Sequence, residues 1–333
     1  MKPAIRHDWT REEIGAMFER PLLDLVYEAA GVHRQFHNPH DVQWSTLVSV
    51  KTGGCPEDCG YCSQSAHYDS PVDRTPLLSV EEVVEAARIA KENGSTRLCM
   101  GAAWRSPRPG KDWDQVLDMI RAVNGMGMES CVTLGMLNEE QARQLADAGL
   151  TNYNHNIDCS REFYEKIITT RRFDDRLKTI EHVQKAGIGV CSGGIIGMGE
   201  STSDRVGFIH TLATLAKHPD SVPINALVPI DGTPLANQKP LDPFDFVRMI
   251  AVARLTMPAS MVRLSAGRLQ LTEEAQALCF MAGANSIFTG ETLLTTGNPR
   301  FEEDQTLLTK LGLNPMPLHA VELELTQTAG HEG

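Results

Sequence analysis

The sequence lacks several features that would place the protein in other classes. It has no run of about 18 or more apolar residues, the length that a membrane-spanning helix needs. The N-terminus carries Asp8, Glu12 and Glu13 and has no apolar signal-peptide core. Basic residues are outnumbered by 43 Asp and Glu to 31 Lys and Arg, and the net charge of −12 argues against nucleic acid or an anionic membrane as the main partner. We therefore expect a cytoplasmic protein.

The composition is that of an ordinary globular protein. The 333 residues are 41% hydrophobic and 22% charged, which provides an ample core. The chain has no low-complexity segment and no linker of shifted composition. Its eight cysteines, without an export signal, indicate a reducing compartment and metal or catalytic thiols rather than disulfides.

A repeated order of helix, glycine and strand runs through most of the chain. Strands are predicted at 45–51, 95–101, 128–134, 150–157, 188–193, 221–228, 260–264 and 284–289. Glycine after a helix supplies the left-handed turn that releases the chain into the next strand. Eight strands alternating with helices over about 245 residues favour an α/β fold of the TIM-type (β/α)8 barrel class. A doubly wound open sheet has the same element order, but no G-x-G-x-x-G follows the first strand to support it.

The two ends of the chain are predicted to lie outside this barrel. Residues 1–40 form two amphipathic helices, with a capping box at Thr10 and Glu13 and a break at Pro21. We expect this N-terminal helical extension to pack on the outside or base of a barrel that spans residues 41–315. Residues 316–333 are expected to form an irregular C-terminal tail, and disorder is one of the states considered for it.

Three cysteines lie close together in the loop after the first predicted strand. Cys55, Cys59 and Cys62 have the spacing C-x3-C-x2-C, which lets three thiolates converge on one small inorganic group. Three protein sulfurs suit a [4Fe-4S] cluster with one open iron, because fully protein-ligated clusters use four cysteines. Tyr61 would place an aromatic ring beside that iron. A zinc site with His67 as fourth ligand and plain structural thiols are the alternatives.

Three further cysteines fall at matching positions of three predicted strands. Cys99, Cys131 and Cys191 are near mid-strand, and Arg263 is in the seventh strand. Side chains from different strands can meet inside a barrel, and a buried arginine needs an anionic partner or several acceptors. Three thiolates and one cation could therefore hold a second iron–sulfur cluster. Free cysteines are also among the most buried residue types, so the pattern alone leaves both explanations open.

Polar side chains follow the fourth and later strands. Asn154, Asn156 and Asp158 alternate along the predicted fourth strand, so we expect them to share one face and to need a polar ligand or a hydrogen-bond network. Asn156, Asp158 and Asn225 could bind a ureido ring, although ordinary polarity at a strand end is the alternative. The glycine-rich segment 193–200 would let an adenine or methionine group approach the backbone.

The cysteine loop, C-x3-C-x-aromatic-C, resembles the signature of radical S-adenosylmethionine (SAM) enzymes. Later blocks are similar to those of one family among them, the biotin synthases. These blocks are CMGAAW at 99–104, YNHNID at 153–158, VCSGG at 190–194, VPINALVP at 222–229, VRLSAGR at 262–268 and GANSI at 283–287. They cover about residues 20–315 in the family's order, which is a specific match.

The resemblance implies a set of ligands and contacts. It implies that Cys55, Cys59 and Cys62 hold a [4Fe-4S] cluster, and that a [2Fe-2S] cluster is held by Cys99, Cys131, Cys191 and Arg263. It implies SAM contacts at Tyr61, Ala102, Asn156, Asp158, Arg176 and Ile195, with Arg176 at the SAM carboxylate. It is consistent with substrate contacts at Asn154, Asn156 and Asn225. Cys159 and Cys279 lie outside both ligand sets, and we expect them to be packing residues.

The implied activity is that of a radical SAM sulfurtransferase, which inserts sulfur from the [2Fe-2S] cluster into dethiobiotin and forms biotin, the last step of biotin biosynthesis. Such C–H bonds offer nothing to acid–base groups, so radical chemistry from cofactors is required. The implied partners are SAM, dethiobiotin, a one-electron donor of flavodoxin or ferredoxin type, iron–sulfur assembly proteins and a second copy of the chain in a homodimer. The alternatives are another radical SAM enzyme without a sacrificial cluster, and an iron–sulfur carrier or zinc scaffold without catalysis. The polar residues at 156, 158 and 225 argue against a carrier.

Overall fold

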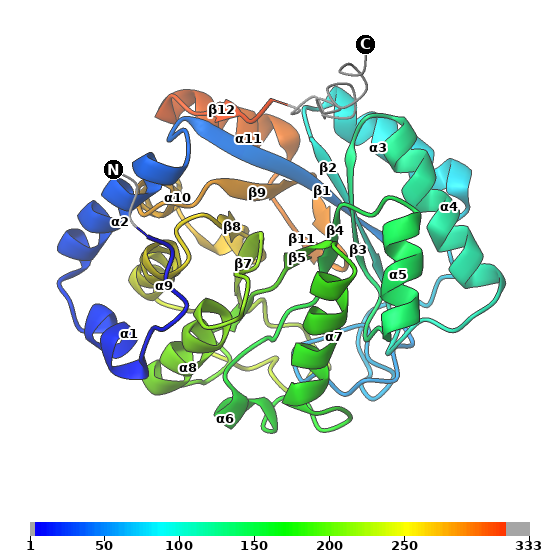
Figure 1. Ribbon diagram of the computed structural model, residues 1–333, viewed down its shortest axis with the longest axis horizontal. Helices are drawn as coiled ribbons and strands as arrows, with labels where there is room; N and C mark the ends of the chain where they lie inside the picture. The colour runs from blue at the N-terminus through cyan, green and yellow to red at the C-terminus, as the bar shows by residue number, and fades with distance from the viewer. Residues whose placement is uncertain (1–3, 318–333) are drawn as a thin grey trace, which may run out of the picture.

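The computed structural model describes residues 4–317, and its centre is a barrel of parallel strands (Figure 1). The barrel strands are β1 (Asp41–Lys51), β2 (Arg97–Ala102), β3 (Glu129–Thr133), β4 (Asn152–Asn154), β5 (Gly189–Cys191), β7 (Ser221–Ala226), β8 (Met261–Leu264) and β9 (Ser286–Thr289). Each strand pairs with the next in this order, and β9 pairs back to β1, with Gln43 opposite Ser286. The predicted (β/α)8 barrel is confirmed, and the open sheet is excluded because the first and last strands are hydrogen-bonded.

The fourth strand is shorter than predicted. β4 ends at Asn154, so Asn156 and Asp158 lie in the irregular segment that follows it. The backbone at Asp158 is left-handed, with φ of 68°, and the Asp158 carbonyl accepts a hydrogen bond from the Ile195 N–H at 2.8 Å. This bond ties the segment to β6 (Gly194–Ile196), a short additional strand that pairs with β7. The predicted alternation along one strand was therefore wrong beyond Asn154, although all three side chains reach the same cavity.

Helices cover the outside of the barrel (Figure 1). They are α3 (Val80–Glu92), α4 (Lys111–Gly125), α5 (Glu139–Asp147), α6 (Arg161–Tyr164), α7 (Phe173–Lys185), α8 (Thr202–Ala213), α9 (Pro243–Thr256), α10 (Glu273–Met281) and α11 (Phe301–Leu311). α3 begins with a capping box in which the Ser79 hydroxyl accepts from the Glu82 N–H and the Glu82 carboxylate accepts from the Ser79 N–H. The glycine that follows α3, Gly94, has φ of 88°, which releases the chain toward β2 as the glycine pattern predicts.

The N-terminal residues form the two predicted helices. α1 (Arg11–Phe18) begins with the capping box of Thr10 and Glu13, and Pro21 precedes α2 (Leu22–Phe36). α1 packs against α8 and α9, and α2 packs against α9 and α10, on the outer surface of the helical layer. At the other end, β12 (Asn314–Pro315) pairs with the start of β1. Of the predicted tail, residues 318–333 lie outside the described residues.

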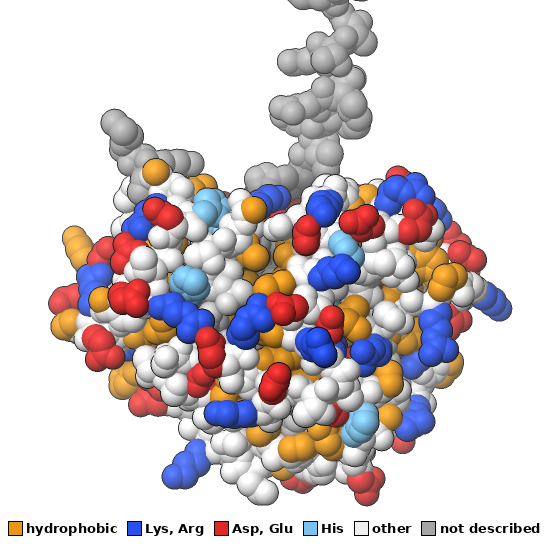
Figure 2. Space-filling view, turned by 60° about the horizontal axis from the view of Figure 1, so that its bottom comes forward, with side chains coloured by type: hydrophobic (Ala, Val, Ile, Leu, Met, Phe, Trp, Pro, Cys, Tyr) orange, Lys and Arg blue, Asp and Glu red, His pale blue; other side chains and the backbone are white. Residues whose placement is uncertain are grey.

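Charged side chains lie on the surface, and apolar side chains form two clusters in the interior. Figure 2 shows acidic and basic side chains intermixed over one face of the molecule, with apolar side chains exposed between them. Between the barrel and its helices lies one large apolar core. Inside the barrel a second, smaller cluster is formed by Cys99, Cys131, Cys191, Phe288 and Leu293. In residues 4–317 no helix has the length and apolarity required to cross a membrane.

One fully buried arginine ties α9 to the barrel. Arg254 is 0% exposed and donates to the carbonyl oxygens of Pro258 at 2.9 Å, Ser260 at 2.7 Å and Gly283 at 2.7 Å, and to the Asn285 side chain at 2.9 Å. These acceptors lie just before β8 and β9. The guanidinium therefore fixes where both strands begin.

We predict that Arg254→Met lowers the free energy of unfolding by roughly 3–5 kcal/mol, because the substitution leaves several buried carbonyl oxygens without a donor. The measurement is urea unfolding of the purified protein. Arg88→Met is the matched control, since Arg88 makes only exposed ion pairs on α3, and it is expected to cost about 0.5 kcal/mol or less. Equal losses in the two variants would contradict this role.

Candidate functional site

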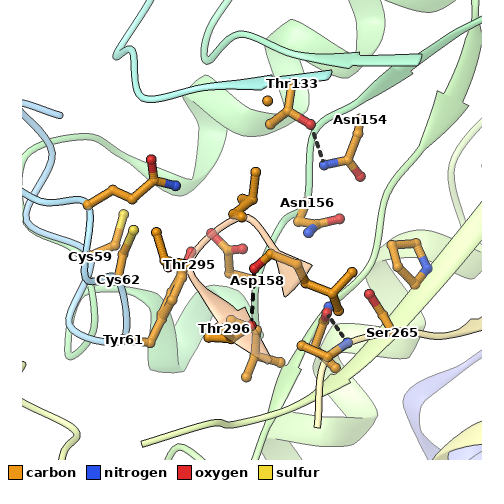
Figure 3. Close-up of a pocket in the computed structure, with 18 of the residues that line it drawn as sticks. Cys59, Tyr61, Cys62, Thr133, Asn154, Asn156, Asp158, Ser265, Thr295 and Thr296 are labelled. Carbon is orange, nitrogen blue, oxygen red and sulfur yellow. Dashed lines mark hydrogen bonds between the residues drawn. The ribbon is translucent and has the colours of Figure 1, made fainter. Parts of the chain in front are cut away.

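A cavity of about 310 Å3 lies at the carboxyl ends of the barrel strands. In a (β/α)8 barrel this end carries the loops that build active sites. The cavity is lined by every predicted site residue except Cys191, namely Cys55, Cys59, Tyr61, Cys62, Cys99, Ala102, Cys131, Asn154, Asn156, Asp158, Arg176, Ile195, Asn225 and Arg263. Figure 3 shows Cys59, Tyr61 and Cys62 on one side of this cavity and Asn154 and Asn156 on another. The barrel thus brings together residues spread over about two thirds of the chain.

The cysteine loop folds back on itself at the mouth of the cavity. The Cys55 N–H donates to the Gln64 carbonyl at 2.9 Å, and the Cys55 carbonyl accepts from the Ala66 N–H at 2.7 Å. Burial raises the pKa of the Cys59 thiol to about 12 and that of Cys62 to about 11. These thiols are costly to ionise without a positive partner, and a metal centre is the usual partner for buried thiolates.

Two arginines, Arg171 and Arg105, lie beside the cysteine loop. The Arg171 guanidinium donates to Cys59 Sγ at 3.2 Å and lowers the cost of a negative sulfur there. Glu57 is buried, accepts from the Thr170 hydroxyl, and lies 3.2 Å from Arg105 Nη1. His67 is not among the residues that line the cavity, and its Nε2 lies 3.1 Å from the Pro56 carbonyl oxygen. The arrangement does not support His67 as a fourth zinc ligand.

The second set of thiols lies inside the barrel. Cys99 on β2 and Cys131 on β3 are directly opposed, and Cys191 packs with them in the cluster inside the barrel. The neighbouring Cys131 thiol lowers the pKa of Cys191 to about 6, assisted by Arg97 and Arg263. Arg97 Nη1 is 3.6 Å from Cys191 Sγ. The three thiols therefore form one group in a positive environment.

Arg263 is the second cation of this group. It is 1% exposed, and its Nε donates to Ser286 Oγ at 2.8 Å while its Nη2 lies 3.2 Å from Gln43 Oε1 and 3.2 Å from Ser45 Oγ. Its Cζ lies 4.5 Å from the centre of the Phe288 ring. A buried arginine was expected to have an anionic partner or several acceptors, and the hydrogen-bond partners of Arg263 are neutral acceptors. The positive charge is left to act on the thiols.

Both thiol sets fit an iron–sulfur cluster better than a single ion. Within residues 4–317, no three His, Cys, Asp or Glu side chains converge closely enough to hold one metal ion. A cluster does not require such convergence, because each thiolate can bind a different iron. The number of sulfurs, their burial and the cations beside them match clusters at both positions. Cys159 and Cys279 are buried in the apolar core, as expected of packing residues.

Polar side chains also line the cavity that the two thiol sets share. Asn154 Nδ2 donates to Thr133 Oγ1 at 3.0 Å, so its carbonyl oxygen is left for the cavity (Figure 3). Asn156 Oδ1 accepts from the Gly193 N–H at 3.1 Å, which leaves its amide N–H groups. Both polar groups of the Asn225 side chain bond to the backbone. Its Nδ2 donates to the Gly194 carbonyl at 2.9 Å, and its Oδ1 accepts from the Ala266 N–H at 3.1 Å. Two of the three amides therefore present unused groups.

Asp158 and Arg176 form a buried ion pair in the same wall. Arg176 Nη2 lies 2.5 Å from Asp158 Oδ2, and Arg176 Nε donates to the Tyr164 hydroxyl at 3.1 Å. Both charged side chains are less than a tenth exposed. The left-handed backbone at Asp158 costs of order 1 kcal/mol, and such residues cluster at functional sites. Arg176 thus lies buried in the cavity wall and is not a surface residue.

Sequence reasoning missed several of these residues. Arg171, Glu57 and Arg97 contact or flank the thiols, and His155 is buried in the wall with no hydrogen-bond partner at either ring nitrogen among the described residues. One signal was available for Arg97, because it lies two residues before Cys99 on one strand and shares its face. Arg171 has no such local signal.

Comparison with known proteins places these residues in a family context. Residues 49–212 match the radical SAM superfamily, and residues 223–314 match the Biotin and Thiamin Synthesis associated domain. The chain is 58% identical over 321 residues to the biotin synthase of Parvibaculum lavamentivorans, covering 96% of this chain and 95% of that protein. It is 59% identical over 309 residues to the biotin synthase of Granulibacter bethesdensis, covering 93% and 98%.

Two solved structures share the fold at low sequence identity. Methylornithine synthase has a TM-score of 0.79 at 18% identity, covering 93% of this chain and 94% of that chain. The FeFe-hydrogenase maturase HydG of Carboxydothermus hydrogenoformans has a TM-score of 0.78 at 19% identity, covering 92% and 76%. These similarities concern the fold alone.

We predict that Gly194→Ala loosens the Asp158 segment. A Cβ at position 194 would lie 2.4 Å from the Asp158 carbonyl oxygen, so the backbone that holds Asp158 has to move. Hydrogen exchange measured by mass spectrometry should show faster exchange in peptides covering residues 155–160. Gly125→Ala is the control, because a Cβ there meets nothing within 4 Å, and its exchange in this segment should equal that of the wild type. Unchanged exchange in Gly194→Ala would refute the contact.

Proposed function

The chain belongs to the biotin synthase family of the radical SAM superfamily, and we propose that it forms biotin by inserting sulfur into dethiobiotin. The observation that carries this proposal is the presence of two separate sets of three thiols, five of which line one cavity, with Arg263 beside the inner set. An enzyme that uses one cluster for radical chemistry has no need of the second set. A carrier has no need of the polar wall of this cavity. Both rival classes are therefore disfavoured.

The thiols supply the ligands for two cofactors. Cys55, Cys59 and Cys62 would hold a [4Fe-4S] cluster, and Cys99, Cys131, Cys191 and Arg263 would hold a [2Fe-2S] cluster. When bound, these clusters and SAM supply carbon-radical chemistry and the sulfur atom that the protein side chains cannot provide. The protein contributes position and electrostatics: the Arg171 guanidinium supports negative sulfur at the mouth, and Arg97 with Arg263 supports it in the interior.

Six residues are proposed to bind SAM, namely Tyr61, Ala102, Asn156, Asp158, Arg176 and Ile195, all on the cavity wall. Arg176 offers a buried positive charge for a carboxylate, and Asp158 offers acceptors for hydroxyl or ammonium groups. Because these two form a mutual ion pair, the ligand would join a charge network that is already paired. Such preorganisation reduces the cost of ordering the site on binding.

Substrate contacts are proposed for Asn154, Asn156 and Asn225. A ureido ring has two N–H donors and one carbonyl acceptor, and the wall offers the unused Asn154 carbonyl oxygen and the unused Asn156 amide N–H groups. Asn225, whose two ends bond to the backbone, would act by fixing residues 194 and 266. The enclosed interior would keep water from a reactive carbon centre.

The remaining parts of the proposal follow from this reaction. A one-electron donor of flavodoxin or ferredoxin type, iron–sulfur assembly proteins, a homodimer and a cytoplasmic location are proposed with it. We also propose that residues 41–315 form the catalytic barrel and that residues 1–40 are an outer helical extension. These assignments stay predictions.

The test is a sulfur-labelling experiment. Protein reconstituted anaerobically with iron and 34S-sulfide should convert dethiobiotin to biotin that is two mass units heavier, with dithionite as reductant and two SAM molecules consumed for each biotin. The measurement is mass spectrometry of the product in unlabelled buffer. Unlabelled biotin would show another sulfur source, and absence of biotin with both clusters in place would refute the function.

We predict that Asn154→Ala raises the KM for dethiobiotin by about tenfold or more, because one ureido N–H loses its acceptor. The KM for SAM should change little, since Asn154 is not among the proposed SAM contacts. Steady-state assays that vary each substrate separately provide the measurement. Asn93→Ala on the exposed end of α3 is the control. A parallel rise in both KM values would indicate a structural role instead.

A further inference from the structure

A second pocket, of about 560 Å3, lies on the outer side of the cysteine loop. Its charged lining residues are Lys51, Arg105, Arg108, Lys111 and Asp112, which is four basic residues against one acidic residue. The whole chain carries a net charge of −12. A local excess of positive charge on so acidic a protein is a feature that composition alone does not explain.

Only a thin wall separates this basic pocket from the inner cavity. Gly54 and Pro56 line the basic pocket, while Cys55 between them lines the cavity. Ala103 and Trp104 line both spaces. The Cys55 segment and one aromatic side chain therefore stand between the outer surface and the proposed [4Fe-4S] ligands.

Two of the basic side chains are free to meet a partner. Arg108 and Lys111 are exposed, and in the described part of the chain neither makes a hydrogen bond or an ion pair. Several exposed cations elsewhere are paired, for example Arg88 with Glu85, Arg143 with Glu140, and Lys310 with Glu273. Unpaired cations grouped at one pocket form a surface that attracts negative charge.

Arg74, outside the pocket lining, and Lys51, within it, strengthen the positive field at the loop. Arg74 lies over the glycines before Cys55, with Nε 3.2 Å from the position that a Cβ of Gly54 would occupy. Lys51 Nζ donates to the Gly53 carbonyl oxygen at 3.3 Å. Positive charge is thus concentrated where the loop reaches the surface.

We propose that this basic pocket is the docking surface for an acidic one-electron carrier protein, which passes its electron through the Cys55 segment. The inference rests on the proposed function, in which the cluster must receive one electron for each SAM consumed. In the step, the carrier loses one electron and is oxidised, the iron–sulfur cluster gains that electron and is reduced, and no bond forms or breaks. A protein is favoured over a small anion because the free cations are exposed on the rim instead of converging on an enclosed point.

The test uses the double variant Arg108→Glu/Lys111→Glu of the cluster-loaded protein and a purified bacterial flavodoxin, which is an acidic flavin protein. Surface plasmon resonance at low salt should show binding to the wild type that weakens as sodium chloride rises. The variant should bind about tenfold more weakly or worse, because two attractive charges become repulsive. An acidic side chain at position 111, the first residue of α4, suits the helix N-terminus, so folding is not at risk from it.

The matched control is Lys178→Glu/Lys217→Glu, which changes the net charge equally at exposed positions outside this pocket. It should bind flavodoxin within about twofold of the wild type. The second readout is biotin formation driven either by reduced flavodoxin or by dithionite. The pocket variant should lose turnover with flavodoxin by about tenfold and keep it with dithionite, because dithionite does not need the docking surface.

The outcomes separate the two proposals. Equal flavodoxin binding by the wild type and the pocket variant would overturn the docking surface while dithionite-driven turnover leaves the enzyme function intact. Equal loss in the Lys178→Glu/Lys217→Glu control would also overturn it, because net charge alone would then explain the effect. Absence of biotin from the wild type with dithionite would instead refute the proposed function.

Discussion

The hydrogen bonds between β9 and β1 are the constraint on which the rest of the structure depends. They close the sheet, so that the carboxyl ends of all eight barrel strands meet at one rim. Closure places Arg263 on β8 within reach of Gln43 and Ser45 on β1, although these residues are 220 and 218 positions apart in the sequence. It also places the Cys55 loop, which follows β1, opposite the polar segment after β4. An open sheet would leave the two thiol sets without a common cavity.

The thiols at the mouth of the barrel and those inside it lie in different chemical environments. At the mouth, burial raises the thiol pKa values of Cys59 and Cys62, and Arg171 is the cation in contact. Deeper inside, the neighbouring Cys131 thiol and two arginines, Arg97 and Arg263, lower the pKa of Cys191. Because the amides of Asn154 and Asn156 line the same cavity as five of the six thiols, a substrate held there would lie within one space with both thiol sets. This shared cavity is what links the fold to sulfur insertion.

The sequence predicted the features that depend on local signals. Glycines after helices and short apolar runs located the strands, and the spacing of Cys55, Cys59 and Cys62 located the loop site. Contacts across the barrel could not be predicted in this way: Arg171 and Cys59 are 112 residues apart, and Arg97 and Cys191 are 94 apart. The early end of β4 also had no signal, because the left-handed backbone of Asp158 is stabilised by bonds to the chain near residues 193–195. Propensity gave a longer strand than these tertiary bonds allow.

The central claim is that one chain holds two different iron–sulfur clusters on two different thiol sets. The most direct measurement is 57Fe Mössbauer spectroscopy, with iron and sulfide analysis, of anaerobically purified wild type, Cys55→Ala and Cys191→Ala. The account predicts that Cys55→Ala loses the [4Fe-4S] signal and keeps [2Fe-2S], and that Cys191→Ala does the reverse. If Cys191→Ala keeps all its iron, the inner thiols hold no cluster and the account of sulfur insertion is contradicted.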